Sequence, residues 1–225
     1  MKLIALDAST EACSAALLVD GAVIERYQLA PRRHAELILP MLESLLGETG
    51  LSVTDLDALA FGRGPGAFTG LRIAAGVAQG IAFGADLPVV PVSTLAALAQ
   101  GVYHEQGATR VLAGIDARMH EVYWGRYALG DGEVMVLEGE ERVCSPQAVE
   151  VPSHGQWVGA GTAWQTYAEV LGKHLRGRIT TWLGERYPRA RDIAILAAQD
   201  FKWGLAMEAE QALPVYLRDN VVKRP

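Results

Sequence analysis

The fold of this chain is indicated by one stretch, LIALDASTEACSAAL, which spans residues 3–17. An apolar strand ends in Asp7-Ala8, a few residues and a glutamate follow, and a second apolar strand returns. The same arrangement appears about half a chain later in VLAGIDARMHEVYWG, residues 111–125, around Asp116-Ala117. A weak repeat at this long period predicts two similar lobes rather than a solenoid. The alternative is that two β-hairpins simply look alike.

The segments around the two stretches predict alternating strands and helices. Up to residue 105 the expected order is β-β-β-α-β-α-β-α, with a two-residue hairpin at Asp20-Gly21 and a cap at Ser93 or Thr94. Helices are expected at residues 33–48, 69–84, 95–104 and 188–203. This pattern is typical of an α/β fold with mixed sheets flanked by helices. We expect an N-terminal lobe at 1–105 and a smaller, less regular C-terminal lobe at 106–225.

Length and composition predict an ordinary globular protein. The chain has 225 residues, of which 50% are apolar and 20% are charged. Its apolar runs are too short to cross a bilayer, and its first residues predict a strand rather than a signal peptide because Asp7 interrupts them. Two cysteines, Cys13 and Cys144, give neither a disulfide framework nor a metal spacing, so we expect a reduced cytoplasm and no membrane.

The charge argues against unaided binding of nucleic acid. The net charge is −6 and the pI is about 5.4, whereas proteins that hold tRNA or DNA by themselves usually show a basic stripe. The densest basic stretches read as solvated surface charge; they are Arg32–Arg33, the trio Arg186, Arg189 and Arg191, and Lys223–Arg224.

A glycine-rich loop, FGRGPGAFTG, occupies residues 61–70. It is not a Walker A loop, because no lysine is present to meet phosphates. Gly64, Gly66 and Gly70 fit a dinucleotide fingerprint only loosely, and the next strand does not end in the acidic residue that this motif requires. Two interpretations stay open. The backbone amides at the start of the next helix could hold an anion, or the loop is a tight turn that needs permissive backbone angles.

No convincing catalytic set is visible in the sequence. No two of the five histidines lie three or four residues apart, and neither a G-x-S-x-G nor a C-x-x-C motif is present. Asp7 and Asp116 both follow apolar strands and could hold Mg²⁺ across a cleft between the lobes. Neither has a lysine or a second carboxylate nearby, so we expect no catalytic residue, no metal and no cofactor.

Two neighbouring helices carry more apolar or small residues than one buried face requires. The first is rich in leucine around most of its circumference, and the second has a G-x-x-x-G-x-x-x-G line that lets another helix approach closely. These faces either pack only against the chain's own core or form a partner surface, which we favour. The predicted interface residues are Leu37, Ile38, Met41, Leu42, Leu45, Gly76, Gly80 and Gly84.

Several segments together resemble the TsaB (YeaZ) family. They are LIALDASTEACSAAL, PRRHAELILPML, FGRGPGAFTGLRIAAGVAQG, PVSTLAALAQ, GIDARMHEVYW and PVYLRD. The resemblance covers nearly the whole chain and is weakest at about Gly130–Arg186. It implies a two-lobed actin-like (ASKHA, ribonuclease-H-like) fold, in which Asp7, Gly64, Gly66 and Asp116 are structural or vestigial remains of a nucleotide-binding site.

The resemblance also implies a function. It identifies the chain as a non-catalytic subunit needed to make N6-threonylcarbamoyladenosine at position 37 of tRNAs that read codons beginning with A. Its implied partners are the catalytic paralogue TsaD, whose His-x-x-x-His metal motif this sequence lacks, and the ATPase TsaE. A homodimer is expected when the chain is alone. The alternatives are a free-standing phosphotransferase or metallopeptidase of the same fold, and a tRNA-binding chaperone that acts alone.

Overall fold

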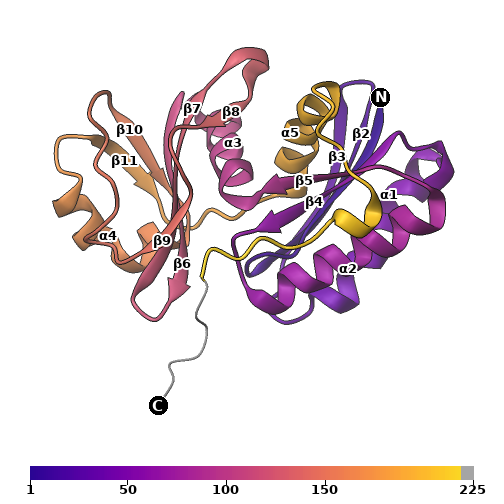
Figure 1. The fold of residues 1–225 in the computed structure, drawn as a ribbon, viewed down its shortest axis with the longest axis horizontal. Helices are drawn as coiled ribbons and strands as arrows, with labels where there is room; N and C mark the ends of the chain where they lie inside the picture. The colour runs from indigo at the N-terminus through magenta and orange to yellow at the C-terminus, as the bar shows by residue number, and fades with distance from the viewer. Residues whose placement is uncertain (219–225) are drawn as a thin grey trace.

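The computed structural model describes residues 1–218 and forms two lobes side by side (Figure 1). Each lobe is built on a mixed sheet, with strand order β3-β2-β1-β4-β5 in the first and β11-β10-β6-β7-β8 in the second. In each sheet the opening strand pairs antiparallel with the next strand and parallel with a later one. Taken from β8 to β11, the second order therefore matches the first, and β9 adds one further strand beside β7. This match confirms the repeat and the two-lobed actin-like fold.

The strands and helices lie close to the expected positions. The strands are β1 (Lys2–Asp7), β2 (Ala12–Val19), β3 (Ala22–Leu29), β4 (Ala58–Gly64), β5 (Val89–Ser93), β6 (Arg110–Arg118), β7 (Glu121–Leu129), β8 (Met135–Leu137), β9 (Arg142–Cys144), β10 (Trp157–Ala160) and β11 (Ile179–Leu183). The α-helices are α1 (His34–Thr49), α2 (Phe68–Ala85), α3 (Thr94–Gln106), α4 (Thr162–His174) and α5 (Ala190–Lys202).

Local chemistry explains where several elements begin and end. Asp20 and Gly21 both have positive φ and join β2 to β3 in a two-residue hairpin, as predicted. The Ser93 hydroxyl accepts hydrogen bonds from the backbone N–H groups of Leu95 and Ala96, so Ser93 is the cap of α3. Gly50 closes α1 in a left-handed conformation.

Helices cover both faces of the first sheet, which is why β1 is apolar along its whole length. Ile4 and Leu6 pack into the core beneath α1 and α2, whereas Leu3 and Ala5 pack on the opposite face against α5. In the second sheet, α3 covers one face and α4 covers the other.

The last helix of each half packs against the other half. The helix α3 follows β5 of the first sheet but packs on β6 and β7, and α5 follows β11 but packs on β1 and β2. The sequence assigns the helix α5 to the C-terminal lobe, but its residues complete the core of the N-terminal lobe. The division of the chain at residue 105 stays a prediction. No helix in the described part of the chain is long and apolar enough to cross a bilayer.

Candidate functional site

The two repeated turns meet where the lobes touch. Asp7 ends β1, and Asp116 lies near the end of β6, the equivalent strand of the other sheet. Arg118 joins the two turns, because its Nη1 lies 3.2 Å from Asp116 Oδ2 and its Nη2 lies 3.1 Å from Glu11 Oε1. The structure thus brings together the two acidic turns that the sequence predicted to be equivalent.

The Asp7 carboxyl is completely buried. Its Oδ2 accepts hydrogen bonds from the backbone N–H of Ser9 at 3.1 Å and from the Ser9 hydroxyl at 2.9 Å. Within residues 1–218, its Oδ1 has no hydrogen-bond partner. Burial raises the pKa of Asp7 to about 7, and the two Ser9 hydrogen bonds oppose this shift only in part.

The glycine-rich loop closes directly over this turn. A Cβ at Gly62 would overlap Asp7 Oδ1, one at Gly66 would overlap the carbonyl oxygen of Ser9, and one at Gly70 would overlap that of Ala8. These three glycines allow the glycine-rich loop to approach the turn after β1 closely. Gly64 has a different role, because its φ of +111° is a backbone conformation that glycine adopts without strain.

The start of α2 packs directly against this turn. The backbone N–H of Ala67 donates to the Ser9 carbonyl oxygen at 2.7 Å, so the first turn of the helix already faces the carbonyl groups of the turn after β1. The free oxygen of Asp7 lies against Gly62. These residues do not fit the metal and phosphate groups that an active actin-like enzyme would hold there.

Asp116 is placed differently. Its backbone N–H donates to Thr162 Oγ1 at 2.9 Å, and its Oδ1 accepts from the backbone N–H of Arg118 at 2.8 Å. The Arg118 side chain is 73% exposed and supplies the positive charge beside this carboxylate. Among residues 1–218, no three His, Cys, Asp or Glu side chains come together in a way that could bind a metal ion.

The leucine-rich helix α1 corrects part of the predicted interface. Ile38, Leu42 and Leu45 lie in the chain's own core, with exposed fractions of 0%, 3% and 0%. They point toward the first sheet because positions 38, 42 and 45 share one helix face. The prediction that they contact a partner is wrong for this fold. Leu37 and Met41 are half-buried, and Leu39 is exposed.

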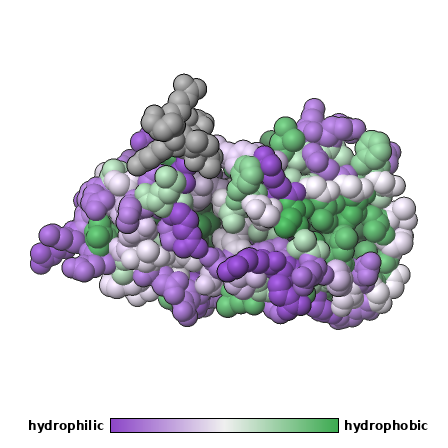
Figure 2. Space-filling model, turned by 90° about the horizontal axis from the view of Figure 1, so that it is seen from below, coloured by the Kyte–Doolittle hydropathy of each residue, from purple (hydrophilic) through white to green (hydrophobic). Residues whose placement is uncertain are grey.

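The helix α2 leaves its glycine line at the surface. Gly76, Gly80 and Gly84 are exposed, and a Cβ at any of them would meet no atom of the described residues within 4 Å. Half-buried Ile73 and Val77 flank the line, and Phe83 beside it is 73% exposed. We call these six residues the glycine face. Figure 2 shows an extended hydrophobic area on this side of the first lobe, whereas the other lobe is largely hydrophilic in the same view.

Sequence reasoning missed several residues that shape these two sites. Phe83 and Leu39 are apolar and exposed on α2 and α1, but nothing in their local sequence separates them from their buried neighbours. Ser9, Arg118 and Thr162 act through contacts with distant segments or with the aspartates. The only local signal was that Ser9 and Arg118 each lie two positions after an aspartate.

Comparisons with known proteins place the chain among tRNA-modification proteins. Residues 27–225 match the family model described as "TsaD: tRNA N6-adenosine threonylcarbamoyltransferase". The chain is 46% identical to the tRNA threonylcarbamoyladenosine biosynthesis protein TsaB of Escherichia coli, covering 98% of this chain and 96% of that protein. It is 42% identical to the protein of the same name from Haemophilus influenzae, covering 98% and 95%. The structure of YeaZ from Pseudomonas aeruginosa superposes with a TM-score of 0.90 at 52% identity, covering 96% of this chain and 99% of that one.

Proposed function

The chain belongs to the TsaB (YeaZ) family, and from this membership we propose that it is a non-catalytic subunit required for threonylcarbamoylation of adenosine 37 in tRNAs that read codons beginning with A. In this proposal it acts in the cytoplasm by binding the catalytic paralogue TsaD together with the ATPase TsaE. The tRNA is held only through the complex, which agrees with the net charge of −6.

The observation that carries the proposal is the exposed glycine line of α2. A glycine inside an exposed helix costs about 1 kcal/mol relative to alanine. Nothing within residues 1–218 requires these three glycines, because a Cβ at each would meet no atom of this part of the chain within 4 Å. A surface that keeps such costly residues is suited to another helix that approaches it closely, and apolar Ile73, Val77 and Phe83 beside the line favour burial.

The family match supports TsaD as the partner. A family model described by that enzyme's name covers most of this chain, so the two proteins share a fold and carry equivalent helices. Two related subunits can pair about a pseudo-two-fold axis and pack α1 and α2 of each into a four-helix bundle. When TsaD is absent, the same face is expected to pair with a second copy of this chain, because apolar patches of this kind rarely stay in contact with water.

The turn after β1 supports a role without chemistry of its own. Asp7 is sealed beneath Gly62, and the carbonyl groups of Ala8 and Ser9 lie against the glycine-rich loop. In an active phosphotransferase this position would have to be open to a metal and a phosphate. Here the repeated glycines let two backbone segments close the space.

One observation favours a second candidate, a free-standing enzyme of the actin-like fold. A buried carboxyl with an unpartnered oxygen and a pKa of about 7 is common at functional sites. Calorimetry with ATP and Mg²⁺ on the isolated chain tests this candidate. Stoichiometric binding with hydrolysis would favour the enzyme over the subunit.

The partner surface is tested by replacing Gly80 with glutamine. The fold tolerates the larger side chain because the position faces open space, so the variant should stay folded and lose its pairing with TsaD. Gly172→Gln is the matched control. Gly172 also lies in a helix, and an added Cβ would meet nothing in residues 1–218 within 4 Å, but it belongs to α4 of the other lobe. Phe83→Glu is a second variant, which introduces an unpaired charge where burial is expected.

Size-exclusion chromatography with light scattering, alone and with TsaD, measures the pairing, and circular dichroism confirms the fold. The control should pair like the wild type. If folded Gly80→Gln and Phe83→Glu both bind TsaD with unchanged affinity, the interface lies elsewhere and the proposal for this surface is wrong.

A further inference from the structure

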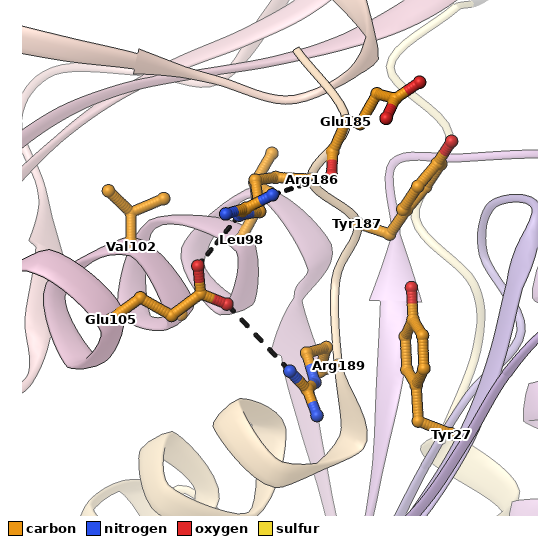
Figure 3. A pocket seen from close by; sticks show the side chains of 9 residues that line it. Tyr27, Leu98, Val102, Glu105, Glu185, Arg186, Tyr187 and Arg189 are labelled. Carbon is orange, nitrogen blue, oxygen red and sulfur yellow. Dashed lines mark hydrogen bonds and ion pairs between the residues drawn. The ribbon is translucent and has the colours of Figure 1, made fainter. Parts of the chain in front are cut away.

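A small pocket lies where the linker between β11 and α5 passes α3 and β3 (Figure 3). Its volume is about 130 Å³. It is separate from the two aspartate turns and from the glycine face, because it is lined by residues of β3, α3 and the linker. Two walls with different chemistry face each other across it.

One wall is formed by three charged side chains. Arg186 Nε donates to Glu105 Oε2 at 2.8 Å, and Arg189 Nη1 lies 3.9 Å from Glu105 Oε1. Two guanidinium groups therefore share one carboxylate. The three side chains are 35% to 40% exposed, so a ligand that enters from solvent can reach them.

Arg189 is the fixed member of this wall. It hydrogen-bonds to Glu25 on β3, with its Nε 3.1 Å from Glu25 Oε2, and its guanidinium lies over the ring of Tyr27 at 4.8 Å from the centroid. Arg186 and Glu105 have each other as their principal partner, and Arg186 also donates to the Glu185 carbonyl oxygen. The Arg186–Glu105 pair is the part of the wall that can open.

Tyr27 and Tyr187 form the opposite wall, as Figure 3 shows, together with Glu185, whose carboxylate accepts a hydrogen bond from Gln165. Burial raises the pKa of both phenols. Both hydroxyl groups therefore keep their protons at neutral pH and can donate hydrogen bonds to a ligand.

The charges of the first wall determine which ligand fits. A simple anion that binds Arg186 leaves the Glu105 carboxylate without its closest partner. A simple cation that binds Glu105 leaves the Arg186 guanidinium without its closest partner. A zwitterion replaces both partners at once. Its carboxylate meets Arg186 and Arg189, and its ammonium group meets Glu105. We propose that this pocket binds a free α-amino acid with a short polar side chain, whose hydroxyl would face the two tyrosines.

The proposal is tested with the full chain by isothermal titration calorimetry, with L-serine and L-threonine as probes. Two relatives of serine each lack one charge: N-acetyl-L-serine has no ammonium group, and ethanolamine has no carboxylate. We expect binding of the amino acids and a loss of about tenfold or more for each relative. Sodium acetate and inorganic phosphate test whether the pocket is a simple anion site.

Variants connect the binding to the pocket. Arg186→Gln and Glu105→Gln should each weaken binding of serine by about tenfold or more. Arg142→Gln is the matched control, because it removes an arginine from the exposed Glu140 pair elsewhere in the second lobe. Circular dichroism checks that each variant is folded. If one of the two pocket variants does not fold, the binding of serine by the other tests the proposal.

Three results would overturn the proposal. The first is that neither amino acid binds the wild-type chain. The second is that acetate, phosphate or ethanolamine binds as tightly as serine. The third is that a folded Arg186→Gln or Glu105→Gln variant binds serine like the wild type.

Discussion

The turns after β1 and β6 occupy equivalent places in two sheets of the same strand order, yet their aspartates have different surroundings. Asp7 is buried beneath a glycine-rich loop, with one oxygen unpartnered within residues 1–218. Asp116 is held by an exposed arginine and lies beside a threonine at the start of α4. We infer that the loops after β4 and β10, rather than the aspartates themselves, give the two turns their different surroundings.

The helices that follow these loops differ in the same way. In the first lobe α2 has 18 residues and an exposed line of three glycines. Its counterpart α4 has 13 residues and a single glycine, Gly172, facing open space. The first lobe, in which the aspartate is buried, is thus also the lobe whose helix exposes a line of glycines.

Asp7→Asn is expected to have the largest effect on stability, through its pH dependence. The folded pKa is about 7 and the ordinary value is 3.8, so between these pH values the unfolded chain is ionised at this position while the folded chain is protonated. The favourable contribution of Asp7 is complete below about pH 4 and is lost as the pH rises through 7. That loss is on the order of 4 kcal/mol, and asparagine avoids it.

Urea unfolding at several pH values between about 4 and 8 checks this prediction. The stability of Asp7→Asn relative to the wild type should rise between about pH 4 and pH 7 and level off above that. Asp116→Asn, measured beside it, removes the equivalent carboxyl from the other turn. Parallel pH profiles for the wild type and Asp7→Asn would contradict the burial argument.

Gly70→Ala tests whether the first turn is sealed by close backbone approach. Its Cβ would overlap the Ala8 carbonyl oxygen, which cannot move aside as a flexible side chain would, so we expect a loss of about 3 kcal/mol in the free energy of unfolding. In the second turn, Thr162→Ala removes only the hydrogen bond from the Asp116 N–H, at about 1 kcal/mol. Equal losses in the two turns, measured by urea unfolding, would mean that they are held in the same way.

Alanine substitutions compare the two helices. Gly76→Ala and Gly80→Ala in α2, and Gly172→Ala in α4, should each raise the free energy of unfolding by about 1 kcal/mol, because all three sites are helical and unobstructed. Only the α2 variants should weaken association with TsaD, since an added methyl group separates closely packed helices. A Gly80→Ala variant that is more stable and binds TsaD unchanged would remove the proposed reason for the glycine line.

Local signals in the sequence predicted much of the fold. The Asp20-Gly21 turn, the Ser93 cap and the extent of α1 each follow from residues within a few positions, and each is confirmed. The β6–β7 turn shows the limit of this approach. Met119 and His120 adopt positive φ without a glycine or asparagine to indicate it.

The parts that the sequence could not predict depend on contacts between distant segments. Ile38 is buried and Leu39 is exposed, but the two are chemically alike, and only the position of the sheet distinguishes them. The role of Gly66 and Gly70 depends on Ala8 and Ser9, about 60 positions earlier in the chain. Likewise, α5 packs on a sheet whose strands end about 100 residues before it.

Arg118→Ala is expected to have the smallest effect. Arg118 joins the two turns through Glu11 and Asp116, but its side chain is 73% exposed. Exposed ion pairs contribute less than about 1 kcal/mol, and salt screens them further. The variant should therefore unfold close to the wild type, with any difference shrinking as salt is added. In a reconstituted complex with TsaD and TsaE, it should modify tRNA within a few-fold of normal, as should Asp116→Asn. A folded variant that loses modification by about a hundredfold, or about 2.7 kcal/mol of transition-state stabilisation, would instead place an active site at the junction of the two turns.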